Sequence, residues 1–298
     1  MPSFHLPDRA RRSMLFASLA LPAVWPATTH AQTAVPRIVA SFSILADIAR
    51  EVAPAGAEIS ALVGPDADAH VFEPTPADAR RLAQADLVLI NGLNFEGWME
   101  RLVKVSGYRG AVVVASQGLA ARADPHAWQD LAHTRVYVAN LGAAFAARWP
   151  AQRAEIDARQ RAYLARIDAL DQRVRERINA IPREQRRVIT SHDAFGHFGA
   201  AYGIDFFAPQ GWSTHSEPSA AAVARLIRQI RSQGVRALFV ENISDPRLIE
   251  RIAREGGVRI GGTLYSDALS AAGGPADSYL KLVEHNARTL ADALQASR

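Results

Sequence analysis

The 298-residue sequence contains no cysteine. This absence excludes disulfide bonds, and it also excludes a lipid anchor attached through a cysteine. Beyond residue 31, no apolar run reaches the length of a transmembrane helix. The formal net charge is only +4, and no dense basic block lies beside aromatic residues. We therefore expect a globular protein that has no membrane anchor and does not bind nucleic acid.

Residues 1–31 have the pattern of a cleaved signal peptide. Three arginines precede an apolar stretch at 14–27, which is too short for a membrane span, and "THA" at 29–31 is an acceptable small-x-small cleavage site. We expect cleavage near Ala31 and export to a periplasm. The arginine pair before Ser13 fits a twin-arginine signal, and a Sec signal fits equally well.

The rest of the chain repeats one scheme twice, with short apolar runs separated by segments of helical periodicity. The runs predicted as buried strands are 37–41, 59–63, 86–91 and 111–115, then 187–191, 204–209, 236–242 and 258–264. Such alternation is typical of α/β domains with mostly parallel sheets flanked by helices. We expect two α/β lobes, at 32–149 and 183–298.

The segment 150–182 between these lobes has no glycine or proline in its interior. Its apolar residues recur at helical spacing and define one face, while charged residues fill the other. One helix of about 29 residues would be roughly 43 Å long. We expect a rigid helix that joins the lobes, and a coiled-coil dimer helix is the alternative. The apolar positions are Ile156, Tyr163, Ile167, Leu170, Val174 and Ile178.

Four residues of metal-binding type follow predicted strands, at the edge of a parallel sheet where ligands bind. His70 and His126 belong to the first lobe, and His192 and Asp267 belong to the second. Their spacing is too wide for a local zinc finger, so a shared site requires a cleft between the lobes.

Each of these residues also has a simpler explanation. A single histidine in a polar loop is usually solvated. Asp267 could cap a helix in "ALSAAG", and His192 with Asp193 could cap a helix beginning at Ala194. We expect three other histidines not to be ligands: His133, His197 and His215.

Several segments together resemble the zinc/manganese family of periplasmic binding proteins, the metal-capturing components of ABC importers. The resemblance covers essentially all of the chain after the signal peptide. It implies two lobes joined by one long helix, with the metal between them, and it places the ligands at His70, His126, His192 and Asp267. It also implies a membrane permease with its ATPase as partner. The segments are 70–102, "DPHAWQD" at 124–130, "TSHDAFGHFGAAYGI" at 190–204, "STHSEPSA" at 213–220 and "LYSDALS" at 264–270.

Two departures from the family pattern concern the first ligand and the loop that follows it. The family often has Asp-Pro-His at its first ligand, where this chain has Asp68-Ala69-His70. Zinc-binding members often carry a long loop rich in His and Asp between the first two ligands, whereas the segment 115–126 is short and lacks such a tract. We therefore expect no metal-collecting role for that loop.

Three imidazoles and one carboxylate favour one Zn²⁺ per chain. Manganese-binding members resemble this chain but have a carboxylate where His192 stands, so we expect zinc, with manganese or iron as the alternative. Copper and nickel would also bind in vitro. Asp68, Asp193 and Glu73 are predicted to accept hydrogen bonds from ligand imidazoles. We expect a monomer that a periplasmic metallochaperone could load, and the loop 64–73 is the predicted segment of metal release.

Two other functions are consistent with parts of the sequence. A zinc hydrolase keeps a coordination position open for water and needs a general base, but the sequence has no His-Glu-x-x-His motif. A closed site of four residues therefore argues for capture rather than catalysis, and we expect no catalytic residues. An adhesin is the other possibility, and the missing lipid anchor argues against it.

Overall fold

The computed structural model describes residues 1–3, 35–120 and 123–296. The predicted cleavage point near Ala31, and nearly all of the predicted signal segment, lie outside these ranges. From Val35 onward, the described residues form one compact unit.

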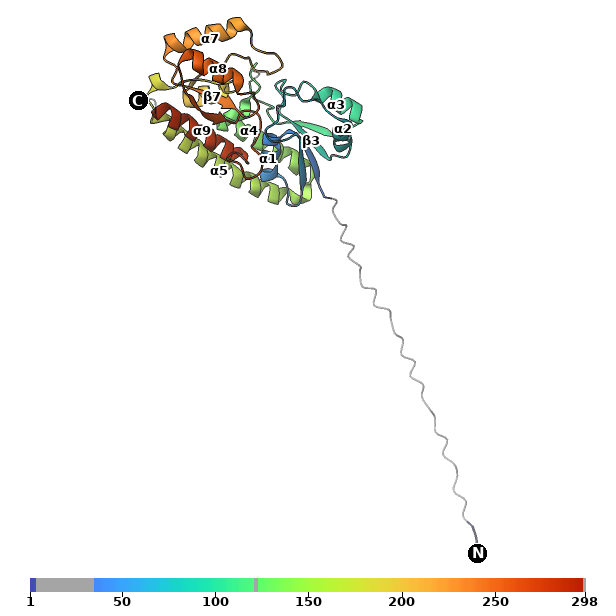
Figure 1. The fold of residues 1–298 in the computed structure, drawn as a ribbon. Helices are drawn as coiled ribbons and strands as arrows, with labels where there is room; N and C mark the ends of the chain where they lie inside the picture. The colour runs from blue at the N-terminus through green and yellow to red at the C-terminus, as the bar shows by residue number, and fades with distance from the viewer. Residues whose placement is uncertain (4–34, 121–122, 297–298) are drawn as a thin grey trace. The chain divides into compact units, whose positions relative to one another are not determined.

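The first half of this unit contains a parallel four-stranded sheet in the order β2-β1-β3-β4. Valine, isoleucine and leucine dominate its strands because helices cover a parallel sheet on both faces. Figure 1 shows helices α2 and α3 beside this sheet. The elements are β1 (Arg37–Phe42), α1 (Ser43–Val52), β2 (Glu58–Val63), α2 (Pro76–Ala83), β3 (Leu87–Ile90), α3 (Met99–Ser106) and β4 (Ala111–Val114).

The second half repeats this topology in the order β6-β5-β7-β8, again with parallel neighbours. Strands β5 and β6 have three residues each, which is shorter than predicted. After Ile189 the chain leaves the regular ladder, and a single bridge pairs His192 with Gln210. The elements are β5 (Arg187–Ile189), α6 (Gly196–Tyr202), β6 (Asp205–Phe207), α7 (Ala220–Gln233), β7 (Ala237–Glu241), α8 (Arg247–Gly256) and β8 (Ile260–Leu264).

The segment between the sheets is the predicted long helix, α5 (Arg153–Asn179), which follows a 3₁₀ turn at Pro150–Gln152. All six predicted apolar positions of α5 are at most 2% exposed. They join one continuous core that includes residues of both sheets. The coiled-coil alternative is wrong, because the chain's own core already covers the apolar face.

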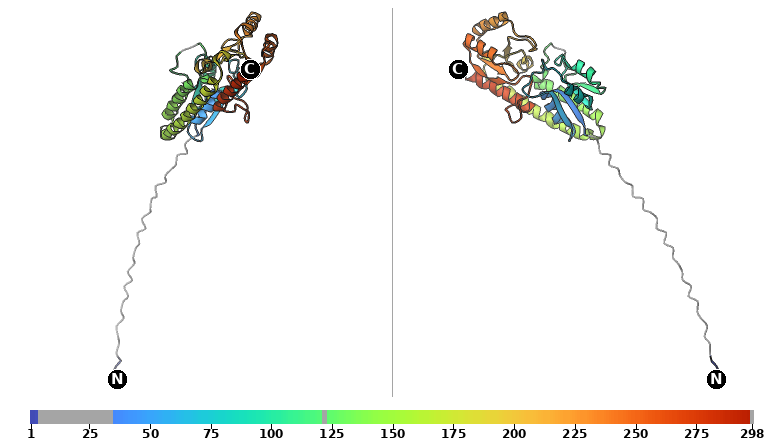
Figure 2. Two further views of the ribbon diagram at one scale, coloured as in Figure 1. Left: turned by 90° about the vertical axis from the view of Figure 1, so that its left-hand side faces the viewer. Right: turned by 45° about the vertical axis from the view of Figure 1, so that its right-hand side comes forward.

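Two helices that we did not predict complete this core: α4 (Leu131–Arg148) and α9 (Tyr279–Gln295). Both pack along α5, and Figure 2 shows α9 and α5 side by side in two views. The buried residues of α4 recur every three or four positions on one face, but the apolar pattern is weak because alanines occupy much of the opposite, exposed face. The core therefore connects the two sheets through helices that run beneath both.

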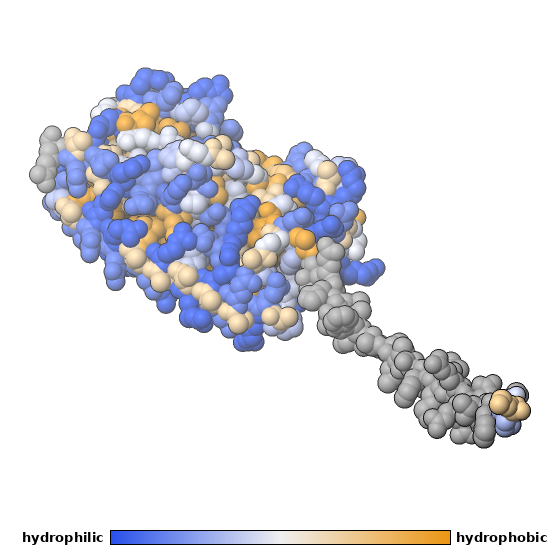
Figure 3. Space-filling model, turned by 90° about the horizontal axis from the view of Figure 1, so that it is seen from below, coloured by the Kyte–Doolittle hydropathy of each residue, from blue (hydrophilic) through white to orange (hydrophobic). Residues whose placement is uncertain are grey.

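The surface seen from below in Figure 3 is mainly hydrophilic, with small and separate apolar areas. Among the described residues, no helix combines the length and apolar character that a membrane crossing requires.

Candidate metal centre

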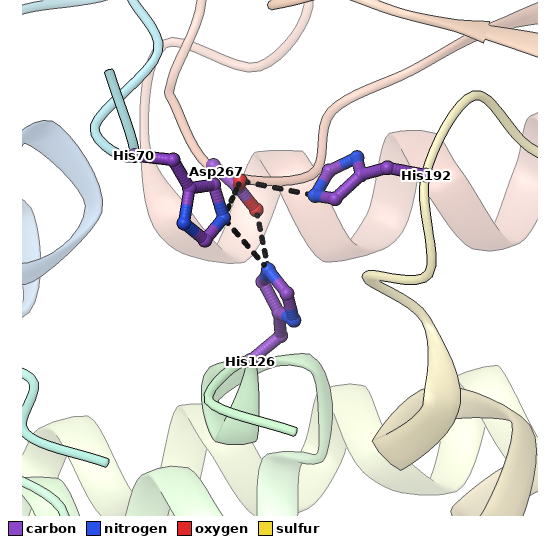
Figure 4. Close-up of side chains that lie close together, drawn as sticks. All are labelled: His70, His126, His192 and Asp267. Carbon is purple, nitrogen blue, oxygen red and sulfur yellow. Dashed lines mark hydrogen bonds and ion pairs between the residues drawn. The ribbon is translucent and has the colours of Figure 1, made fainter. Parts of the chain in front are cut away.

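The structure brings the four predicted ligands together. Each follows a strand at its carboxyl end: His70 after β2, His126 after β4, His192 after β5 and Asp267 after β8. One ligand atom from each residue lies within 4.8 Å of the others. Figure 4 shows the three imidazoles pointing at the Asp267 carboxylate. Within the described ranges, this is the one group of three or more His, Asp or Glu residues arranged in this way.

The separations between these atoms suit one small cation. Asp267 Oδ2 lies 3.2 Å from Nε2 of His70 and 3.3 Å from Nε2 of His192, and the two Nε2 atoms of His70 and His126 are 3.3 Å apart. Asp267 Oδ1 lies 3.6 Å from Nε2 of His126. Tetrahedral zinc with bonds of about 2.0–2.1 Å separates its ligand atoms by about 3.3 Å. A single ion at the centre therefore reaches all four residues with little movement.

Burial makes this cluster energetically unfavourable when no cation is bound. His126, His192 and Asp267 are each 0% exposed. Among the described residues, the Asp267 carboxylate makes no regular hydrogen bond, and the three imidazoles are the ion-pair neighbours that face it, at 3.2–3.6 Å. A buried and unsatisfied polar group is costly, and a buried charge needs a partner of opposite sign. The residues present therefore fit a divalent ion.

The electrostatics of the cluster point the same way. Burial alone would raise the pKa of Asp267, but the neighbouring His126 and His192 outweigh it and hold that pKa well below its ordinary value. Burial alone would lower the pKa of His192, yet Glu241 and Asp267 raise it well above the ordinary value. For His126, Asp267 and Asp124 likewise overcome burial and raise the pKa. The centre is thus an anionic site that attracts positive charge, and an incoming metal ion competes with protons.

Two carboxylates that we did not predict hold the imidazoles from behind. Asp124 Oδ1 lies 2.7 Å from Nδ1 of His126 and accepts the His126 backbone N–H at 3.0 Å. Glu241 Oε2 lies 2.7 Å from Nδ1 of His192, and Glu241 Oε1 accepts the His192 backbone N–H at 2.8 Å. We call Asp124 and Glu241 the positioning carboxylates. The sequence held a signal for each, since Asp124 stands two residues before His126 and Glu241 ends the apolar run "ALFVE".

The three residues predicted to accept hydrogen bonds from the ligand imidazoles have other surroundings. Glu73 is exposed. Asp193 hydrogen-bonds Trp212. Asp68 accepts the backbone N–H of His70 through Oδ1, while its Oδ2 accepts the Thr214 hydroxyl from the other half of the chain.

The loop that carries His70 is further attached to the second half through Asp66. The Asp66 backbone N–H donates to the Leu269 carbonyl at 2.9 Å, and the Asp66 carboxylate accepts from the side chain of Asn242 and from the backbone of Ala271. On the first-half side, Trp98 Nε1 donates to the carbonyl of Ala69 at 2.8 Å. His70 is therefore held by backbone contacts on both sides of the cleft.

The capping alternatives are wrong. Helix α6 begins at Gly196, its N-cap residue is Phe195, and no side chain caps it. No helix begins directly after Asp267, because the next helix is α9, which starts at Tyr279. The other three histidines lie outside the cluster, as we expected. His197 contacts the backbone carbonyl of Asp124, and His215 is exposed.

Comparison with known proteins places this site in a family. Residues 38–293 match ZnuA, the periplasmic component A of the zinc-uptake complex. The zinc-binding protein TroA of Treponema pallidum is 34% identical over 273 residues, which cover 87% of this chain and 89% of TroA. The solved structure of periplasmic TroA aligns with a TM-score of 0.83 and 32% identity over 87% of this chain and 99% of that one.

Other relatives are named for other ions. The manganese-binding lipoprotein MntA of Halalkalibacterium halodurans is 30% identical over 268 residues, covering 87% of this chain and 88% of MntA. The iron-binding protein YfeA of Yersinia pestis is 31% identical over 266 residues, covering 86% and 85%. The shared architecture therefore serves a divalent metal without deciding which one.

Proposed function

The chain belongs to the family of periplasmic metal-binding proteins that serve ABC importers, and from this premise we propose that it captures Zn²⁺ and delivers it to its permease. Members of this family bind a transported substrate and are not enzymes, which removes the hydrolase alternative. The observation that carries the proposal is the convergence of three Nε2 atoms and one carboxylate within 4.8 Å.

The proposed ligands are His70, His126, His192 and Asp267, with one ion per chain. Imidazole is a borderline ligand that suits zinc, whereas manganese prefers hard oxygen ligands. Three nitrogens against one carboxylate therefore favour zinc. Four protein ligands also suit the tetrahedral preference of zinc, and they leave no position for a reactive water. Manganese and iron remain the competing ions, because relatives of the same architecture are named for them.

We propose two lobes, 32–149 and 183–298, which the segment 150–182 joins. Each lobe contributes two ligands. A wide hinge motion would expose the apolar core that both sheets share through α5. In addition, Trp128 and Gln129 both donate to the carbonyl of Ser266, which ties the segment of His126 to that of Asp267. Metal uptake and release therefore involve small movements, and these two ligands move together.

Release is proposed to begin with the loop 64–73. Within the described residues, His70 has no carboxylate at Nδ1, in contrast to the other two histidines. Its position depends instead on the contacts of Asp66 and Asp68 across the cleft. When those contacts break, His70 can leave the ion while the other three ligands stay in place.

For location and partners, we propose export with signal cleavage near Ala31, a monomer in the periplasm, and delivery to a membrane permease with its ATPase. A periplasmic metallochaperone is a further proposed partner, which would transfer the metal ion to the site.

Metal analysis of the purified mature protein tests the proposal. The protein is made metal-free and then dialysed against equal concentrations of Zn²⁺, Mn²⁺ and Fe²⁺ without oxygen, and the bound metal is measured. We expect one zinc per chain. A protein loaded mainly with manganese or iron would show that cavity shape outweighs ligand type. A protein that binds none of the three would refute metal capture.

A further inference from the structure

From the contacts behind the imidazoles, we infer that Asp124 and Glu241 are positioning residues that set the metal affinity of the site by fixing His126 and His192. The inference rests on the proposed function and extends it to residues that do not touch the ion.

Each positioning carboxylate contacts its histidine twice. Asp124 reaches both the backbone N–H and Nδ1 of His126 through Oδ1. Glu241 uses one oxygen for each of the same two atoms of His192. A carboxylate on Nδ1 keeps the proton there, so the lone pair of Nε2 faces the metal and the imidazole becomes a better donor. The hydrogen bond to the backbone N–H fixes the position of the main chain from which the imidazole extends.

The two contacts come from opposite halves of the chain. Asp124 follows β4 and lies two residues before its histidine, whereas Glu241 is the last residue of β7, which neighbours β5 in the second sheet. Glu241 is 0% exposed and Asp124 is 9% exposed. An apolar side chain would be the cheaper occupant of either position, because burying a carboxylate is costly. Both halves nevertheless have a carboxylate behind a proposed ligand, and orienting the imidazole through Nδ1 is a role that requires this negative charge.

His70 provides the contrast within the same site. Asp68 makes the backbone contact to His70, but its second oxygen accepts from Thr214 and not from the ring. The rings of His126 and His192 therefore each have a carboxylate at Nδ1, whereas His70 is held through the backbone of its loop.

The test replaces each positioning carboxylate by its amide, Asp124→Asn and Glu241→Gln. An amide oxygen can still accept the backbone N–H, but the negative charge at Nδ1 is lost. The Kd for Zn²⁺ is measured by competition with a chelator of known affinity. We expect each variant to bind zinc about 10- to 100-fold more weakly. Asp47→Asn is the matched control, since Asp47 is a largely buried carboxylate that accepts the Tyr279 backbone N–H without contacting a proposed ligand. It should leave the Kd within about twofold.

A second step separates positioning from general stability. In a His192→Ala background, Glu241→Gln should change the zinc Kd by less than about twofold, because the ring that it orients is gone. Asp124→Asn in a His126→Ala background should likewise change the zinc Kd by less than about twofold. This second pair provides the test if the Glu241 variant does not fold. An equal loss with and without the histidine would overturn the inference, and so would Kd values like those of the parent in both single variants. Failure of the parent itself to bind zinc would instead refute the proposed function.

Discussion

Thr214 and Asp68 join the two halves of the chain at the edge of the metal centre, where the Thr214 hydroxyl donates to Asp68 Oδ2 at 2.5 Å. Asp68 also accepts the backbone N–H of His70 at 2.8 Å. One side chain therefore links the position of a proposed ligand to the opposite side of the cleft.

Thr214→Val should speed zinc release. The change keeps the shape of the side chain but removes a hydrogen bond to a charged group, which is worth about 1.5–3 kcal/mol. We expect the dissociation rate to rise roughly tenfold, with a small change in the melting temperature of the metal-free protein. Stopped-flow transfer of zinc to an excess of chelator measures the rate. Thr289→Val, which removes a half-buried hydroxyl that contacts His285 on α9, is the control. Equal rates for both variants would show that the Thr214 contact does not restrain His70.

His192→Ala should weaken zinc binding by more than about 100-fold, because a lost ligand costs more than a lost contact behind a ligand. It should also lower the melting temperature of the metal-free protein, since Glu241 and Asp267 would stay buried without the imidazole between them. Chelator competition and thermal melting measure the two effects. His285→Ala removes a half-buried imidazole outside the cluster and should leave zinc binding unchanged. Zinc binding like that of the parent in His192→Ala would remove His192 from the ligand set.

His192→Glu should shift preference toward Mn²⁺ by exchanging a nitrogen for a hard oxygen. The new carboxylate would lie close to Glu241, and two buried like charges repel. The single variant is therefore expected to be unstable, while His192→Glu combined with Glu241→Gln relieves the repulsion. Equimolar metal competition on the double variant should raise the share of bound manganese several-fold over the parent. An unchanged ratio would mean that the cavity, not the ligand, selects the ion.

Leu170→Ala should destabilise the whole unit and not one lobe. Leu170 is 2% exposed on α5 and belongs to the core that reaches both sheets. Removing a buried leucine costs about 2–5 kcal/mol. Denaturant unfolding should show one transition at a lower midpoint, whether followed by far-UV circular dichroism or tryptophan fluorescence. Arg161→Ala on the exposed face of α5 should change the unfolding free energy by less than about 0.5 kcal/mol. Two separate transitions in Leu170→Ala would indicate lobes that unfold independently.

Much of this protein follows from local sequence patterns. Short continuous apolar runs predict the eight strands, because a strand buried between helices is apolar along its length. Hydrophobic periodicity predicts α5, whose six apolar positions recur on one face. Parallel strands direct their carboxyl ends to one edge, and that rule already places His70, His126, His192 and Asp267 where a shared site is possible.

Tertiary structure decided the rest. The sequence pointed to Asp68, Asp193 and Glu73 as partners of the imidazoles because they lie near the proposed ligands along the chain. The structure assigns that task to Asp124 and Glu241, and Glu241 stands 49 residues after His192. Which carboxylate meets a ring depends on strand order, here the pairing of β5 with β7, and strand order is a property of the assembled sheet. The shared core beneath both sheets likewise needs α9, which packs along α5 and contacts α1, both far earlier in the chain. Periodicity records which face of an element is buried, but only the folded chain determines what that face meets.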